Sequence, residues 1–410
     1  MSSLGQNVMR RIDALAAFTD VPGELTRLFL SPAHRAAVPE VRAWMDDAGM
    51  TTRVDAIGNV VGRYEGTAPD LPTLLLGSHI DTVRNAGRFD GNLGVVVAIE
   101  AVAALHRDGI RLPFAIEVLA FGDEEGVRFP MTLSGSKAVS GIFDARAFDC
   151  TDSAGVRLRD ALAAFGGDPD GVAAVARRRD AIAGYVEVHI EQGPVLEAED
   201  LPLGVVTAIN GATRATIGVK GRAGHAGTVP MGLRRDALTA AAEMVLGIER
   251  RCGAVPNLVG TVGQLEVLPG AVNVIPGEVR FTIDVRSPSD EQRRAAIDEI
   301  FALTDGIAAR RALSVTHTVT YDVAAATCDP RLIEELDGAV TRAGLKPRRL
   351  PSGAGHDGLA MVALCPIAML FVRCRGGVSH HPTESITAAD ADLAVRVLVD
   401  FLRHHQPQPH

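Results

Sequence analysis

The segment LPTLLLGSHIDTV (residues 71–83) has the pattern of a buried strand that ends on two polar side chains, His79 and Asp81. Side chains on a strand alternate between its faces, so these two lie on the same face. Two further apolar runs, AIEVLAFGDEEG (115–126) and YVEVHIEQG (185–193), end in the same way. From about residue 71 to 210 such runs alternate with helical stretches, which is typical of crossover connections. The sequence therefore predicts an α/β fold: a mostly parallel sheet with helices on both faces.

The polar residues near these strand ends are of the kinds that bind metal ions. Such groups collect beyond the carboxyl ends of strands in an α/β sheet, so we expect them to form one metal site. Asp90 lies just before a predicted helix, where an aspartate more commonly caps the helix. Only in combination with His79 does it become a candidate ligand. Spacing alone does not separate His380 from the adjacent His381. The expected ligands span about three hundred residues: His79, Asp90, Glu125, His189 and His380.

The adjacent carboxylates Glu124 and Glu125 follow the second apolar run. Together with Asp123 they repel one another unless a cation or protonation relieves the repulsion. Neighbouring positions point in different directions, so one carboxylate can bind a metal while the other acts as general base on a water molecule. A solvated acidic loop is the alternative, and the flanking VLAF and Gly126 favour a buried approach instead.

The pattern of apolar and polar residues changes near residue 211. The segment VRFTIDVRS (279–287) alternates strictly between apolar and polar residues, which predicts a half-exposed strand of an antiparallel sheet. Helical patterns cover 234–251 and 291–307. We therefore expect an inserted α+β domain over 211–325. The α/β pattern then resumes with a buried strand at 365–373 and a helix at 388–405, so 1–210 and 326–410 form one discontinuous domain.

Composition excludes several classes of function. A net charge of −9 without a run rich in Lys and Arg argues against nucleic acid as the main partner. The longest apolar stretch, 93–105, is too short for a membrane span and is expected to be a buried helix. The N-terminus shows no signal-peptide core, and the 5 cysteines lack C-x-x-C spacing. We expect a soluble cytoplasmic protein in a reducing compartment.

One glycine-rich segment matches a dinucleotide-binding motif by spacing alone. The segment GAGHDG (353–358) matches G-x-G-x-x-G, but a dinucleotide site needs a strand directly before the motif. The preceding LKPRRLPS is polar and interrupted by proline, so no strand and no dinucleotide site are expected there.

Several motifs resemble one known family. They are GSHIDTV, GRFDG, DEEGVRF, HIEQGPVLE, GHAGTVPM, AVNVIPGEVRFTIDVR, SGAGHDG and GVSHHPTE. This set resembles the amidase (hydantoinase/carbamoylase) branch of the co-catalytic metallopeptidase clan, which contains allantoate amidohydrolase, N-carbamoyl-L-amino-acid hydrolases and β-ureidopropionase. The resemblance runs from about residue 8 to 402. HIEQGPVLE and SGAGHD are specific to this branch.

The resemblance implies a role for each matching residue. The five ligands would bind two divalent ions, with Asp90 bridging them, Glu125 as a ligand and Glu124 as general base. Asp81 would support the site, and His225 could stabilise the oxyanion. The residues that would bind substrate are Gln192, His225, Asn273, Arg286 and the backbone of Gly355. Arg286 suits a substrate carboxylate because a planar cation can form two hydrogen bonds with it.

The resemblance also implies partners and a substrate class. The inserted domain would act as a lid and as the interface of a homodimer, so that some substrate contacts could come from the partner chain. The metals would be zinc or manganese, with cobalt or nickel possible. The expected reaction is hydrolysis of a ureido C–N bond in a small carboxylate, with release of ammonia and carbon dioxide. DEEGVRF and GSKAVSG favour allantoate as substrate; an N-carbamoyl-L-amino acid or ureidopropionate is the alternative.

Overall fold

The computed structural model describes residues 3–407 and divides into two compact units. The first unit comprises the chain up to Thr207 and again from Thr327, and the second comprises Ala208–Ala326. The boundaries expected from the sequence were 210/211 and 325/326. The first boundary falls within β6 (Leu203–Ile209), and the second falls between the two residues of β14 (Ala326–Thr327).

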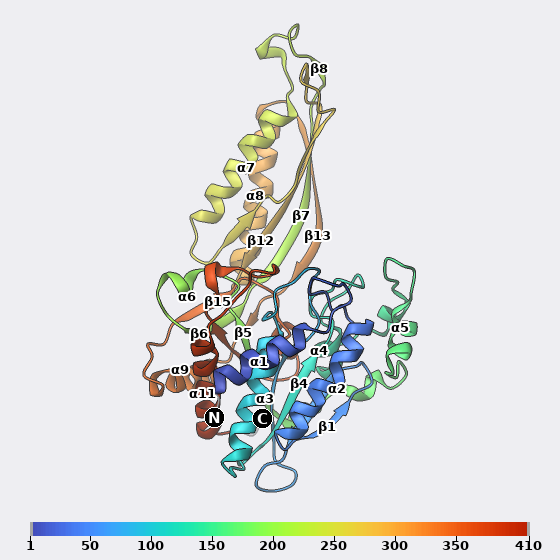
Figure 1. Ribbon diagram of the computed structural model, residues 1–410. Coiled ribbons are helices and arrows are strands. Elements are labelled where there is room, and N and C mark those ends of the chain that lie inside the picture. Colours follow the sequence, from blue (N-terminus) through green and yellow to red (C-terminus); the bar gives the residue numbers. More distant parts are fainter. Residues whose placement is uncertain (1–2, 408–410) are drawn as a thin grey trace. The chain divides into compact units, whose positions relative to one another are not determined.

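A nine-stranded sheet forms the centre of the first unit (Figure 1). Its path is β1-β2-β4-β3-β5-β16-β6-β14, and β15 pairs with β6. The inner strands β4, β3, β5 and β16 run parallel, whereas β1, β2 and β6 pair antiparallel at the flanks. The remaining bounds are β1 Thr51–Val54, β2 Val60–Tyr64, β3 Thr73–His79, β4 Ala115–Phe121, β5 Ile182–Ile190, β15 Arg349–Ser352 and β16 Ile367–Val372.

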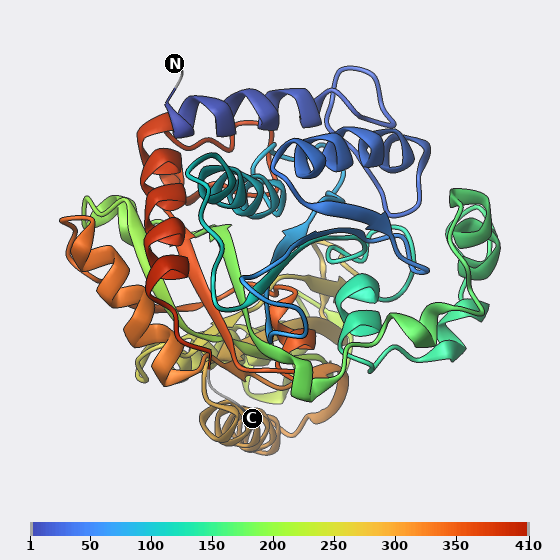
Figure 2. The same cartoon turned by 90° about the horizontal axis from the view of Figure 1, so that it is seen from below.

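Helices cover this sheet on both faces (Figure 2). Helix α3 packs on β3 and β5 together with α1 and α11, and α10 packs with α4 beside β5 and β16. The helices of this unit are α1 Leu4–Ala16, α2 Pro32–Asp47, α3 Asn92–Arg107, α4 Ser134–Val139, α5 Leu158–Phe165, α6 Val195–Ala198, α9 Pro330–Arg342, α10 Gly358–Met361 and α11 Ala388–His404. Four short 3-10 helices accompany them at Ala145–Asp149, Val172–Val175, Arg179–Ala181 and Arg375–Gly377.

The α/β fold predicted from the sequence is confirmed, and α3 explains the longest apolar stretch. This helix is buried almost all around, and its one charged core residue, Glu100, lies 3.2 Å from Arg11. One expectation was wrong. The polar, proline-containing segment before Gly353 does form a strand, β15, because Pro351 sits in a short strand that pairs only with β6. The motif is nevertheless followed by the single turn of α10 and not by a long helix.

The second unit is an antiparallel sheet with two helices on one face (Figure 1). Its main sheet has the order β10-β12-β7-β13, with β9 beside β12, and β8 pairs with β11. The strands are β7 Gly211–Lys220, β8 Gly224–His225, β9 Val259–Thr261, β10 Leu265–Leu268, β11 Val274–Ile275, β12 Glu278–Ser287 and β13 Ser314–Val323. The helices are α7 Ala237–Gly253 and α8 Asp290–Arg310, with a 3-10 turn at Met231–Leu233.

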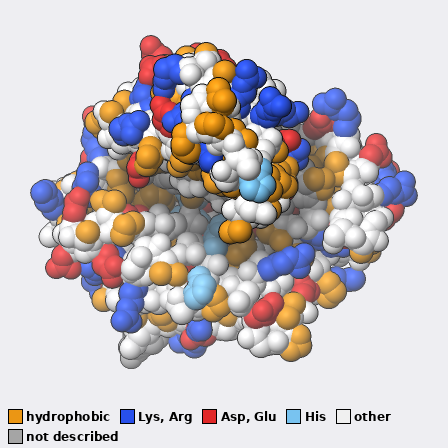
Figure 3. Space-filling model, turned by 90° about the horizontal axis from the view of Figure 1, so that it is seen from above, with side chains coloured by type: hydrophobic (Ala, Val, Ile, Leu, Met, Phe, Trp, Pro, Cys, Tyr) orange, Lys and Arg blue, Asp and Glu red, His pale blue; other side chains and the backbone are white. Residues whose placement is uncertain are grey.

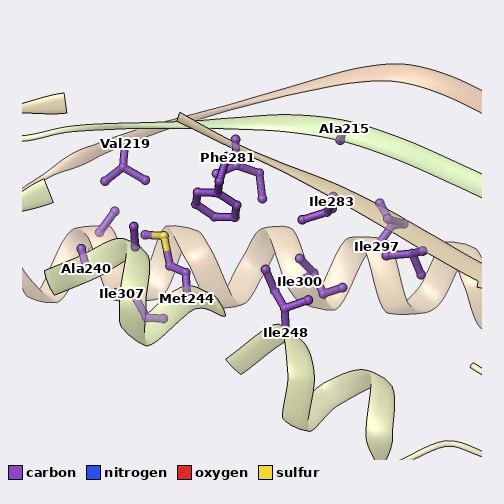
Figure 4. Close-up of a cluster of buried hydrophobic side chains, with 14 of the residues drawn as sticks. Ala215, Val219, Ala240, Met244, Ile248, Phe281, Ile283, Ile297, Ile300 and Ile307 are labelled. Carbon is purple, nitrogen blue, oxygen red and sulfur yellow. The ribbon is translucent and has the colours of Figure 1, made fainter. Parts of the chain in front are cut away.

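Alternation along β12 forms the core of this unit, as the sequence predicts. Phe281 and Ile283 are each 1% exposed and point toward Met244 of α7 and Ile300 of α8 (Figure 4). Thr282 between them and Arg280 before them are less buried and face the other side of the sheet. Burial of one such large apolar side chain stabilises a fold by about 1.5–3 kcal/mol, so this layer gives the sheet its register.

Among residues 3–407, no helix combines the length and the apolar character needed to cross a membrane. On the face shown in Figure 3, basic and acidic side chains are interspersed with apolar and uncharged ones, and Lys and Arg do not gather in one patch there.

Candidate metal centre

Five of the residues selected from the sequence lie together in the first unit. Their ligand atoms form two groups, each within 4.8 Å, and Asp90 belongs to both. One group is His79, Asp90 and His189; the other is Asp90, Glu125 and His380. Two such sets of ligand atoms, which share one carboxylate, could hold a pair of divalent ions.

The sheet explains why these distant residues meet. His79 is the last residue of β3, and His189 lies just before the end of β5. The acidic pair follows β4, and His380 follows β16. These four strands are parallel neighbours, so their carboxyl ends lie at one edge of the sheet. Asp90 reaches the same edge from the turn before α3. Gly91 in this turn has a φ of +66°, and a Cβ there would lie 2.4 Å from the His79 ring.

The two oxygens of Asp90 face different histidines. Oδ1 lies 3.4 Å from Nε2 of His79 and 3.2 Å from Nε2 of His189. Oδ2 lies 3.3 Å from Nε2 of His380, which in turn lies 3.5 Å from Oε2 of Glu125. The neighbouring His381 is exposed and its ring contacts Thr383 instead, so the structure brings His380 and not His381 into the cluster.

Two of the histidine rings are fixed through their other nitrogen. Nδ1 of His79 lies 3.0 Å from the carbonyl oxygen of Asp81, and Nδ1 of His189 lies 2.9 Å from that of Ile190. A proton on Nδ1 that is donated to a carbonyl leaves the Nε2 lone pair directed into the cluster. This is the tautomer that metal-binding histidines use.

Asp81 orients the acidic pair as well. Its Oδ1 accepts the backbone N–H of Glu124 at 3.2 Å, and its Oδ2 accepts that of Glu125 at 3.3 Å. Oε2 of Glu124 lies 3.9 Å from Nε2 of His79, and a Cβ on Gly355 would lie 3.6 Å from Oε1 of Glu124. Glu124 therefore borders the cluster beside Gly355, while Glu125 faces His380.

Burial and the neighbouring charges shift the pKa values of the residues in the cluster. Burial raises the pKa of Glu125 to about 7, and the charge of Asp90 adds to this rise. Burial also raises the pKa of Glu124 well above its usual value. The hydrogen bond with Asp90 raises the pKa of His380 to about 9. Burial opposes ionisation of Asp90, but its bonds to His189, His380 and His79 outweigh this and lower its pKa well below the usual range.

These residues fit a divalent metal pair. Imidazole nitrogens together with carboxylate oxygens are a donor set for zinc, manganese, cobalt or nickel. Oε1 of Glu125 is buried and has no hydrogen-bond partner among the described residues, although a buried carboxylate oxygen normally has one. A cation at the cluster would satisfy this oxygen and replace the protons that the carboxylates and histidines otherwise share.

Gln192 lies in the same cluster. Its Nε2 donates to Oδ2 of Asp90 at 2.7 Å and contacts Ser379 Oγ at 3.0 Å. Gln192 and His380 have φ values of 56° and 55°, and Asp123 before the acidic pair has 69°. Left-handed backbone at non-glycine residues is strained and concentrates at functional sites.

Sequence reasoning missed several polar neighbours of Asp90. Oε1 of Glu384 accepts the backbone N–H groups of Phe89 and Asp90 at 2.7 and 3.1 Å. Ser379 donates to Oδ2 of Asp90 at 2.6 Å. Glu384 lies in the quoted GVSHHPTE motif, and its 3% exposure could have been suspected only from the apolar strand before it.

The remaining predicted substrate residues, His225, Asn273 and Arg286, belong to the second unit. His225 is exposed in β8, and the carbonyl of Asn273 accepts the N–H of Ala226 at 3.0 Å, so these two residues are neighbours. Arg286 lies on β12 and pairs with Asp284 through Nε at 2.8 Å. The strand β12 begins at Glu278, and this end lies towards β8. Arg286 lies about 27 Å further along the strand.

The chain is similar to known proteins over most of its length. A model of the peptidase family M20/M25/M40 matches residues 75–404. Allantoate deiminase from Arabidopsis thaliana is 40% identical over 97% of this chain and 82% of its own. N-carbamoyl-L-amino acid amidohydrolase from Geobacillus stearothermophilus is 40% identical over 96% of this chain and 97% of its own.

A solved structure extends the likeness to the fold. An amidase of the hydantoinase/carbamoylase family from Burkholderia multivorans superposes with a TM-score of 0.92 at 31% identity, and the match covers 99% of this chain and 98% of that one. Peptidases and amidases of this kind all hydrolyse C–N bonds. The chain is a hydrolase of the peptidase family M20/M25/M40, in its hydantoinase/carbamoylase amidase branch.

Proposed function

We propose that the protein is a two-metal amidohydrolase that cleaves the ureido C–N bond of allantoate and releases ammonia and carbon dioxide. The observation that carries the proposal is the sharing of Asp90 between two groups of ligand atoms, with a further carboxylate, Glu124, at their border. The relatives named allantoate deiminase support the substrate.

The ligand assignment follows the two groups. His79 and His189 would bind one ion, Glu125 and His380 the other, and Asp90 both. Zinc or manganese suits these donors best, with cobalt or nickel as further possibilities. When bound, two such ions polarise the ureido carbonyl and make water more acidic.

Glu124 is assigned the proton transfers. Burial raises the pKa of Glu124 well above its usual value, so its ionised form is a stronger base, which can accept a proton from the attacking water and then release it. Water adds to the ureido carbon, and Glu124 passes the proton to the leaving nitrogen as the C–N bond breaks. Asp81 keeps the Glu124 backbone in place during both transfers.

The substrate is assigned to residues of both units. Gln192 and the backbone of Gly355 would contact the ureido group, and His225 would stabilise the oxyanion. Asn273 would contribute a further hydrogen bond, and Arg286 would bind the carboxylate through its planar guanidinium. Asp284 accepts hydrogen bonds from Nε and one terminal nitrogen of Arg286, at 2.8 and 2.9 Å, and thereby fixes the plane of the guanidinium.

A homodimer through the second unit accounts for the separation of these residues. Arg286 and the pair His225 and Asn273 lie at opposite ends of β12, about 27 Å apart along the strand. A substrate of about a dozen heavy atoms cannot span that distance. One active site would therefore combine Arg286 of its own chain with His225 and Asn273 of a second copy, and the second unit would act as lid and interface.

N-carbamoyl-L-amino acids are the second candidate substrates, with ureidopropionate beside them. A relative named N-carbamoyl-L-amino acid amidohydrolase is as similar to the chain, at 40% identity, as the allantoate deiminases. Both substrates carry a ureido group and a carboxylate, so the same metal ligands and the same Arg286 serve either.

The cytoplasm is the proposed location. All 5 cysteines of the chain are unpaired thiols, and Cys252, Cys328, Cys365 and Cys374 are buried. Unpaired cysteines are typical of proteins kept in a reducing compartment.

The direct test is a substrate comparison. Ammonia release from the manganese-loaded protein is measured with allantoate, N-carbamoyl-L-methionine and N-carbamoyl-β-alanine at equal concentrations. We expect turnover of allantoate to exceed that of both carbamoyl compounds. Preference for a carbamoyl amino acid would move the substrate to the second candidate, and no ammonia from any of the three would contradict the proposed reaction.

A further inference from the structure

We propose that Arg27 is a positioning residue of the metal centre, which fixes the His79 strand end and the Asp90 turn to each other from behind. The inference rests on the proposed two-metal function. It concerns a residue that makes no contact with the ligand atoms themselves.

The backbone around Arg27 runs beside the segment that links His79 to Asp90. The N–H of Arg27 donates to Oγ1 of Thr82 at 2.9 Å, and the carbonyl of Arg27 accepts the N–H of Thr82 at 2.9 Å. The carbonyl of Leu25 accepts the N–H of Ala86 at 2.8 Å. The N-terminal segment is thereby attached to the loop after β3.

The guanidinium of Arg27 contacts the backbone at the end of β3. Nε of Arg27 donates to the carbonyl of Ile80 at 2.7 Å, and Ile80 is the residue between His79 and Asp81. One terminal nitrogen donates to the carbonyls of Leu15 and Phe18 at 2.7 and 3.0 Å. All of these acceptors are uncharged, and Arg27 is 0% exposed.

The other terminal nitrogen reaches the Asp90 turn. It donates to Oδ1 of Asn92 at 2.7 Å, and Nδ2 of Asn92 donates to the carbonyl of Asp90 at 3.2 Å. The same side chain therefore contacts the His79 end through Ile80 and the Asp90 turn through Asn92. His79 and Asp90 are two members of one ligand group, so their separation depends on this link.

The position requires a planar cation. Burial lowers the pKa of Arg27 to about 10, which still leaves it charged at neutral pH, and the charges of Asp81 and Asp20 favour that form. A buried charge without a paired carboxylate within hydrogen-bond distance is costly, and this cost is offset by several hydrogen bonds in fixed directions. Lysine offers one nitrogen and cannot reach three groups of acceptors in different directions.

The experiment measures metal affinity directly. Zn²⁺ and Mn²⁺ are titrated into the metal-free full chain against a chromophoric chelator, for the wild type, Arg27→Lys and Arg27→Ala. We expect both variants to bind at least one of the two ions 10- to 100-fold more weakly, the range found when groups behind metal ligands are removed. Circular dichroism and thermal melting of the metal-free proteins establish that each variant is folded at the titration temperature.

A matched control separates this effect from general loss of a buried arginine. Arg293 is also 0% exposed, and it contacts Thr213, Asp290 and Asp322 in the second unit. Arg293→Lys should leave both metal affinities within a factor of about two of the wild type, because none of its partners is linked to the cluster.

Chemical rescue and a second variant complete the test. Methylguanidine at millimolar concentration should restore metal affinity to Arg27→Ala and leave Arg293→Lys unchanged, which a purely structural role would not produce. Asn92→Ala removes only the link to the Asp90 turn and should weaken binding by a smaller factor, even if the Arg27 variants fail to fold.

The outcomes are distinct. Wild-type metal affinity in folded Arg27→Lys and Asn92→Ala would overturn the inference and leave the proposed function intact. A wild-type chain that binds neither Zn²⁺ nor Mn²⁺ would overturn the proposed function itself.

Discussion

Nε2 of His380 lies 3.3 Å from Oδ2 of Asp90, while the other oxygen of the same carboxylate faces two further histidines. His380 follows the strand β16, which returns to the sheet after the whole second unit has been inserted. All five candidate ligands therefore lie in one compact unit despite the insertion.

The roles of the two adjacent glutamates can be separated by isosteric substitution. Glu124→Gln should lower kcat about 10²- to 10⁴-fold, because the amide cannot accept the proton of water, while the metal content stays at the wild-type level. Glu125→Gln is the matched variant and should lower metal content. Metal loss in Glu124→Gln with retention in Glu125→Gln would mean that the two roles are exchanged.

The carboxylate anchor can be tested on a pair of arginines that share one partner. Arg286→Ala should raise KM about 10- to 100-fold, because a charged hydrogen bond contributes about 1.5–3 kcal/mol. Arg214 also binds Asp284, with Nε at 2.9 Å, and Arg214→Ala is the control. Steady-state kinetics on both variants check the assignment, and an equal rise in KM would assign the effect to Asp284 and not to substrate binding.

The metal-free protein should lose stability as the pH rises from about 4.5 to 9. In the folded state burial raises the pKa of Glu125 to about 7, so between its unfolded value and 7 the folded chain binds more protons. The hydrogen bond with Asp90 raises the pKa of His380 to about 9, and its contribution, complete below the unfolded value, is likewise lost on approach to 9.

Thermal melting across this pH range, with and without Mn²⁺, measures the effect. Added metal should reverse the trend, because ions replace the protons and bind more tightly as the ligands lose them. A melting temperature of the metal-free protein that rises from pH 5 to 9 would contradict the charge state assigned to the cluster.

Complementation between inactive chains tests the shared active site. Glu124→Gln and His225→Ala are each expected to be inactive alone. If His225 acts in the partner's site, mixed dimers contain one intact site, and a statistical mixture should regain about a quarter of wild-type activity. Activity that stays at the level of the separate variants after subunit exchange would place His225 in its own chain's site.

The sheet and the clustering of the candidate ligands could be predicted from the sequence for a physical reason. The run 71–79 contains Thr73 and Ser78 but no histidine or carboxylate before His79, so His79 is conspicuous at the strand end. The parallel inner strands then bring those ends together. The antiparallel pair β1 and β2 was not foreseen, because β1 is half-exposed and only four residues long.

Residues that hold the ligand segments in place, without being ligands themselves, could not be recognised from the sequence. Arg27 and Asn92 stand alone in their segments, and nothing in the spacing indicates that either is buried. Ser379 and Glu384 adjoin His380, but their contacts to the Asp90 turn depend on how the chain folds back after β16. Such contacts follow from tertiary structure and not from a periodic pattern.

Metal content in wild type and Asp90→Asn tests the central claim most directly. After loading with Mn²⁺ or Zn²⁺ and gel filtration, elemental analysis should give about two ions per wild-type chain, and close to none in Asp90→Asn, because both groups of ligands lose their shared carboxylate. A wild-type chain without metal, or an Asp90→Asn chain that keeps two ions, would contradict a metal pair joined by Asp90.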